Sequence, residues 1–74
     1  MEDFNMAETG RRIRELRLEQ NMSQSELAEL LGGAQNTIAQ YEKGTAKTSI
    51  EILAKLAVVL KTTADYLLGL TEEY

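Results

Sequence analysis

Residues 22–44 read MSQSELAELLGGAQNTIAQYEKG, and this stretch predicts two short helices joined by a sharp turn. Ser23 and Glu26 have the spacing of a capping box, in which the serine hydroxyl and the glutamate carboxylate satisfy free backbone amides at a helix start. Met22 and Leu27 have the spacing of the hydrophobic staple that accompanies such a box. The first of the two helices is therefore expected to begin directly after Ser23.

Glycines mark the ends of both helices. Gly32 and Gly33 follow the first apolar face and allow the backbone to leave the helix through positive φ. The second helix is expected over residues 35–43, and Gly44 is well placed to end it. The first helix should bury the apolar residues that recur at helical spacing, which are Leu27, Ala28 and Leu31.

The second helix has two different faces when its residues are placed at about 100° intervals. Thr37, Ile38 and Tyr41 share the side expected to face inward. The opposite arc holds no carboxylate and carries Gln35, Asn36, Ala39, Gln40 and Lys43. Side-chain amides can bond the N6 and N7 atoms of adenine in pairs, and an alanine methyl can touch the thymine methyl. On its own, the same arc is also typical of an ordinary solvated helix face.

The chain resembles, over nearly its whole length, the helix-turn-helix domain of lambdoid phage repressors and Cro proteins, the xenobiotic-response-element-like regulators. The resemblance rests on the order and spacing of short groups of residues. They are Gly10 to Arg17, Ser23-Gln24, Leu27-Ala28, Leu31-Gly32, Thr37-Ile38, Tyr41 to Gly44, Ser49, Leu56-Ala57 and Asp65 to Leu68. The resemblance implies an all-α, compact five-helix bundle whose third helix, residues 35–43, enters the major groove of double-stranded DNA.

The resemblance also implies roles for individual residues. Gln24 matches a family glutamine that contacts phosphate and braces the glutamine opening the recognition helix, here Gln35. Arg17 and Glu42 match a largely buried salt bridge between the first and third helices. Base reading is expected from Gln35, Asn36 and Gln40, and contact with the DNA backbone from Gln24, Lys43, Thr45 and Lys47. Because this face has no arginine, the contacted positions are expected to be richer in A·T than in G·C.

The chain departs from the family pattern at two places. Ala34 stands where the family usually has Ser or Thr, and alanine cannot accept a bond from the free amides of the recognition helix. The loss is expected to cost roughly 1 kcal/mol and to remove a hydroxyl that could touch phosphate. Lys61-Thr62 replaces the Gly-Val that commonly precedes the last helix, so a less tight corner is expected there.

The remaining elements follow from caps and periodicity. A first helix is expected over residues 10–20 with Thr9 as its cap, Ile13, Leu16 and Arg17 inward, and Asn21 at its end. A fourth helix is expected to begin at Thr48 or Ser49, to reach Leu60 and to bury Ile50, Leu53, Leu56, Ala57 and Leu60. Thr63 should cap a fifth helix carrying Tyr66, Leu67 and Leu70. The charges Arg11, Arg12 and Arg14 fit a solvated face and phosphate contact equally well.

Length and charge limit the possible domain organisation and binding partners of the chain. Seventy-four residues suit one domain, here residues 10–70, with a flexible segment at residues 1–9 in which Phe4 could fold back, and an acidic tail at residues 71–74. The formal net charge is −4, but residues 1–10 and 62–74 together carry six of the 12 acidic residues and none of the eight basic ones, so the middle is net positive. Such a distribution weakens the objection that an acidic chain should avoid nucleic acid.

Composition excludes several classes of function. Without cysteine or histidine, no disulfide and no usual zinc site is expected. Because there is also no phosphate-cradling loop and the carboxylate clusters lie at the ends of the chain, we expect neither a cofactor, a metal nor an enzyme. No apolar run approaches the ~20 residues of a membrane span, and the N-terminus is acidic where a signal peptide would be basic. A cytoplasmic protein without a membrane partner is expected.

Apolar residues remain on the last two expected helices beyond what one small core needs. They are Ile52, Val58, Leu68 and Leu70. They fit either scattered surface positions or a two-fold dimer contact, which would let two recognition helices read pseudo-palindromic half-sites about 34 Å apart. The sequence thus favours a DNA-binding transcriptional regulator, most simply a repressor. The alternative is a protein-interaction module, such as an antitoxin-like or adaptor protein, which the acidic balance and Ala34 would suit.

Overall fold

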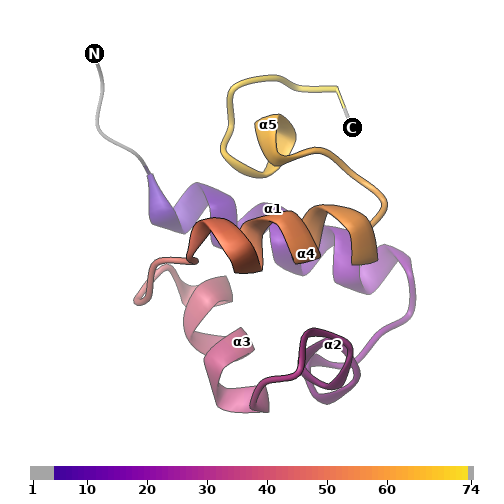
Figure 1. The fold of residues 1–74 in the computed structure, drawn as a ribbon. Helices are drawn as coiled ribbons and strands as arrows, with labels where there is room; N and C mark the ends of the chain where they lie inside the picture. Colours follow the sequence, from indigo (N-terminus) through magenta and orange to yellow (C-terminus); the bar gives the residue numbers. More distant parts are fainter. Residues whose placement is uncertain (1–4, 74) are drawn as a thin grey trace.

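The computed structural model describes residues 5–73, and this part of the chain is all-α (Figure 1). Its helices are α1 (Met6–Glu19), α2 (Gln24–Leu31), α3 (Gln35–Lys43), α4 (Ile50–Val59) and α5 (Ala64–Leu67). α3 packs against both α1 and α2, and α5 packs against α4 and α1. Figure 1 shows α5 on the opposite side of α1 from α3. The expected five-helix architecture is confirmed.

The predicted caps and glycines of the helix-turn-helix segment set its helix ends, with Gly33 as the exception. The Ser23 hydroxyl accepts from the Glu26 amide at 3.0 Å, and the Glu26 carboxylate accepts from the Ser23 amide at 2.9 Å, so the capping box is complete. Gly32 ends α2 with φ 76° and Gly44 ends α3 with φ 78°. Gly33, in contrast, does not have a positive φ, because the single left-handed residue already turns the chain.

α1 begins four residues earlier than predicted. The Asn5 side chain accepts from the Glu8 amide at 3.1 Å and caps the helix, so the prediction that Thr9 is the cap is wrong. Thr9 instead lies inside α1 and is 4% exposed. The extra turn is held by a tertiary contact, since a Cβ placed on Gly44 would come within 2.7 Å of the Ala7 Cα. Residues 6–9 are therefore helical, whereas Phe4 lies outside the described residues.

Gly10 allows α1 and α3 to approach closely. A Cβ at this position would lie 2.6 Å from the carbonyl oxygen of Glu42 and would also clash with that of Tyr41. Real Cβ atoms do not come so near to backbone oxygen, so any larger residue would push the two helices apart. The C-terminal end of α3 is thus pressed against the first half of α1.

One continuous core holds the helices together. It consists of Ile13, Leu16, Leu27, Ala28, Leu31, Ile38, Leu56, Leu60, Tyr66 and Leu67. The prediction that Ile50 joins this core is wrong, because its side chain is 89% exposed. Ile50 is the first residue of α4, where the helical stripe continues in sequence but no other element covers it. None of the helices between residues 5 and 73 is long and apolar enough to cross a bilayer.

Candidate nucleic-acid interface

The outward face of α3 carries the polar side chains that the sequence placed there. Gln35, Asn36, Gln40 and Lys43 are exposed, and Ala39 is half-buried among them. On the inward side, Ile38 is only 2% exposed, while Thr37 and Tyr41 are half-buried. The helix therefore turns one apolar side to the core and an amide-rich side without a carboxylate to solvent.

A buried ion pair fixes α3 to α1. Arg17 Nε donates to Glu42 Oε2 at 2.7 Å, and Arg17 Nη2 donates to Glu42 Oε1 at 3.0 Å. The two side chains are 8% and 3% exposed. Arg17 Nη1 also donates to the Met22 carbonyl at 2.7 Å, which ties the pair to the start of α2. The hydrogen bond to Glu42 raises the pKa of Arg17 above its ordinary value, so the guanidinium stays charged. The predicted salt bridge is confirmed.

A chain of amide hydrogen bonds extends from this ion pair to the surface. Gln24 Nε2 donates to Glu42 Oε1 at 3.1 Å, and Gln35 Nε2 donates to Gln24 Oε1 at 2.6 Å. The first residue of α2 thereby braces the first residue of α3, as the resemblance implied. Gln35 is exposed, yet its orientation is linked through Gln24 to a carboxylate inside the protein.

The start of α3 lacks a side-chain cap. Ala34 has the extended backbone of a cap residue, with φ −100° and ψ 148°, but no side-chain hydrogen bond is made there. The free amides at this helix end belong to Gln35 and Asn36, which are exposed residues. Helix N-termini attract anions because their amides are unpaired and the helix dipole is positive there.

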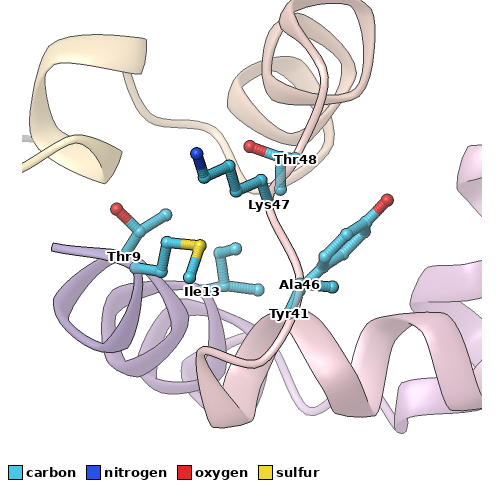
Figure 2. A pocket seen from close by; sticks show the side chains of 7 residues that line it. Thr9, Ile13, Tyr41, Ala46, Lys47 and Thr48 are labelled. Carbon is cyan, nitrogen blue, oxygen red and sulfur yellow. The ribbon is translucent and has the colours of Figure 1, made fainter. Parts of the chain in front are cut away.

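The last residue of α3 and the loop after it present other residues that were predicted to contact the DNA backbone. Lys43 and Lys47 are exposed, and neither forms an ion pair with any residue from 5 to 73. Figure 2 shows the Lys47 side chain stretched along a small hollow whose labelled walls include Thr9, Ile13 and Tyr41. The Thr45 hydroxyl donates to the Gln40 carbonyl at 3.2 Å, so its one hydrogen is already used.

The three arginines at the start of α1 do not form one face. Arg12 is 4% exposed and donates to Glu8 at 2.9 Å, to the Tyr66 carbonyl at 3.1 Å and to Glu72 at 2.9 Å. Its guanidinium also lies 4.4 Å from the centre of the Tyr66 ring. Neither a solvated face nor phosphate contact describes such a residue, so both interpretations are wrong for Arg12.

The neighbours of Arg12 differ from it. Arg11 is paired with Glu8 and Glu15 on the surface of α1, whereas Arg14 is exposed and forms no ion pair within residues 5–73. The spacing of Glu8 and Arg12, one helical turn apart, is a local signal for this cluster. The signal was missed because the first helix was expected to start only after Glu8.

The residues predicted to form a dimer contact are not equally accessible. Val58 and Leu70 are 79% and 74% exposed. Ile52 and Leu68 are half-buried, and Ile52 packs against the core. Between residues 5 and 73 there is no group of three or more His, Cys, Asp or Glu side chains that could hold a metal ion.

Comparisons with known proteins place this geometry among transcriptional regulators. The sequence model of the helix-turn-helix family matches residues 13–67. The HTH-type transcriptional regulator AnsR of Bacillus subtilis is 48% identical over 58 residues, which are 78% of this chain and 50% of AnsR. The chain spans about half the length of the curated relatives it matches.

Solved structures agree with the sequence comparison. The P22 c2 repressor, in complex with a synthetic operator, superposes with a TM-score of 0.79 at 32% identity, over 81% of this chain and 91% of that one. The biofilm regulator SinR of Bacillus subtilis, in complex with DNA, gives a TM-score of 0.75 at 36% identity, over 81% and 97% of the two chains. The chain belongs to the lambda-repressor/Cro-like helix-turn-helix family.

Proposed function

We propose that this protein binds double-stranded DNA in a sequence-specific manner and acts as a transcriptional regulator, with α3 lying in the major groove. The observation that carries the proposal is the outward face of α3, where exposed amides without a carboxylate stand beside the ammonium groups of Lys43 and Lys47, which form no ion pair within residues 5–73. The operator and DNA complexes of the P22 c2 repressor and SinR support it by similarity. A regulator of this kind would act in the cytoplasm, most simply as a repressor that occupies an operator.

Reading and positioning are divided between two sets of residues. Gln35, Asn36 and Gln40 would contact base edges, while Gln24, Lys43, Thr45 and Lys47 would contact the DNA backbone. Gln24 keeps one hydrogen on Nε2 for a phosphate oxygen after its bond to Glu42. Thr45 would have to release the Gln40 carbonyl before its hydroxyl could donate to phosphate.

A homodimer would complete the reading of an operator. One recognition helix covers only a few base pairs, and two of them related by a two-fold axis would read half-sites about 34 Å apart. The exposure of Val58 and Leu70 supports a contact through α4 and the residues after α5, with Ile52 and Leu68 at its inner edge.

Selection of bound duplexes from a random pool tests the proposal. We expect recovered sites with paired half-sites that are richer in A·T than in G·C at the contacted positions. Recovery of G-rich sites, or of no preferred sequence, would contradict it.

The salt dependence of binding tests the positioning residues separately. Removing one lysine that neutralises a phosphate should reduce the slope of log affinity against log salt by about 1. Lys47→Ala is expected to do so, and Lys61→Ala, an exposed lysine in the corner between α4 and α5, is the matched control. An adaptor protein that does not bind DNA would show little affinity at any salt concentration.

A further inference from the structure

We propose that Glu42 fixes the direction in which the Gln35 amide faces the DNA, and thereby selects adenine over guanine at the base that Gln35 reads. The inference rests on the DNA-binding function proposed above. It makes Glu42 a positioning residue, since the carboxylate is 3% exposed and would touch no nucleotide itself.

The direction follows from the chemistry of a carboxylate. An ionised carboxylate only accepts hydrogen bonds, so the end of Gln24 that lies 3.1 Å from Glu42 Oε1 must be its NH₂ group. The other end of that amide, the carbonyl oxygen, then faces Gln35. Because an oxygen is the partner at 2.6 Å, Gln35 must in turn offer its NH₂ group. One negative charge thus determines the orientation of two amides in succession.

The free atoms of Gln35 are consequently defined. Its Oε1 makes no hydrogen bond with residues 5–73, and one hydrogen on Nε2 remains after the bond to Gln24. An acceptor beside a donor is the pattern that matches adenine, whose N6 donates and whose N7 accepts. Guanine offers two acceptors, O6 and N7, and would place O6 against the Gln35 oxygen.

An unbraced glutamine would discriminate less, because both hydrogens of its Nε2 would be free to turn towards the two acceptors of guanine. The terminal amide torsion is broad and roughly two-fold, so a free side chain can exchange its oxygen and nitrogen by rotation. The bidentate bonds from Arg17 hold Glu42 in place and keep its charge balanced inside the protein. In this series of hydrogen bonds, Glu42 is therefore held rigidly inside the protein, while Gln35, which would read the base, lies at the surface.

Side-chain amide hydrogen exchange in the free protein tests the chain of bonds without DNA. We expect the Nε2 hydrogens of Gln24 and Gln35 to be protected relative to those of Gln40, whose side-chain amide is exposed and makes no hydrogen bond with residues 5–73. Gln24→Met removes the link and leaves Arg17 and Glu42 paired, so protection at Gln35 should fall to the level of Gln40. Equal exchange of Gln35 and Gln40 in the unaltered protein would overturn the inference.

Selection of duplexes by the same variant tests the consequence for specificity. A bidentate amide contact discriminates by about 5- to 150-fold, and Gln24→Met should reduce the preference at one base pair of each half-site towards parity. Affinity for every site should also weaken by a uniform factor, because methionine cannot donate to the phosphate that Gln24 is proposed to bind. Uniform weakening with the preference for adenine intact would overturn the inference.

Two further variants test the charge of Glu42. Glu42→Gln keeps the shape of the side chain but introduces a donor and removes the charge that balances Arg17, so its folded fraction is first measured by circular dichroism. The folded fraction should relax the same base pair as Gln24→Met does. Glu29→Gln makes the same charge change on an exposed residue of α2 without an ion pair in residues 5–73, and it should leave all preferences unchanged. If the unaltered protein selected no sequence at all, the DNA-binding proposal would fail, while the exchange experiment would still decide whether the amide chain exists.

Discussion

Arg12 and Arg17 lie five residues apart on α1, and both are buried, yet they hold opposite sides of the molecule. Arg17 binds a carboxylate that is 3% exposed and fixes the recognition helix. Arg12 binds two backbone carbonyls, the Tyr66 ring and the carboxylate of Glu72, whose side chain is 88% exposed, and so holds the chain after α5.

The two arginines differ in how far water reaches the carboxylate with which each is paired. Glu42 and Arg17 have little access to water, so neither member of the pair is well solvated alone. Glu72 is largely in water, and an ion pair with an exposed partner contributes little because solvent screens it. The side of α1 that faces α3 should therefore be intolerant of losing its carboxylate partner Glu42, whereas the side that faces α5 should tolerate the loss of Glu72.

The largest effect is expected for Glu42→Ala. Removing one member of a buried pair leaves Arg17 charged and unpaired, at a cost of about 3 to 5 kcal/mol in the free energy of unfolding. Urea denaturation measures it. Glu72→Ala is the matched control and should cost less than about 1 kcal/mol. Similar losses in the two variants would show that the two arginines do not differ as described.

Arg12→Met is expected to have an intermediate effect. Methionine keeps the apolar stem but removes the donor of the Thr71 carbonyl and one of the donors of the Tyr66 carbonyl, which keeps the Gly69 amide, at a cost of about 1 to 3 kcal/mol. Backbone hydrogen exchange should quicken after α5 and stay unchanged in α3. Arg14→Met, on the exposed side of α1, should change stability by no more than about 0.5 kcal/mol. Faster backbone hydrogen exchange throughout α3 would contradict the claim that Arg12 holds only the chain after α5.

A smaller gain is expected from Ala34→Ser at the start of the recognition helix. A serine hydroxyl can accept one of the free amides of α3, which should raise the free energy of unfolding by about 1 kcal/mol. Ala54→Ser, at an exposed position inside α4, should instead lower it slightly, because serine is the weaker helix former. Thermal unfolding of the two variants should therefore shift in opposite directions.

The smallest effect concerns Glu8, which pairs with both Arg11 and Arg12. Hydrogen bonds from Arg11 first and Arg12 second lower the pKa of Glu8 from 4.5 to about 2. A carboxyl whose pKa is lowered by folding stabilises the native state above its unfolded pKa and loses that contribution as the pH falls. Glu8→Gln should thus flatten the decline in stability between pH 4.5 and 2. Glu29→Gln, the exposed control, should leave the slope of the decline as it is.

Much of α2 and of the recognition helix α3 could be predicted from the sequence, because the signals that define them are local. The capping box at Ser23, the glycines after α2 and α3, and the angular separation of Ile38 from Gln35 each depend on residues a few positions apart. Missed features depended on contacts from elsewhere in the chain. α1 starts at Met6 where Ala7 meets Gly44, and Arg12 is buried by residues more than fifty positions away.

The sequence by itself determined where helices begin and end around the turn and which α3 residues point outward, since caps and periodicity act within one or two helical turns. The resemblance added the partner of Arg17. Only the tertiary structure decided that Ile50 is left uncovered, that Gly10 lets α1 and α3 approach closely, and that Gln24 also bonds to Glu42. These are contacts between separate helices, and their distances depend on how the whole core packs.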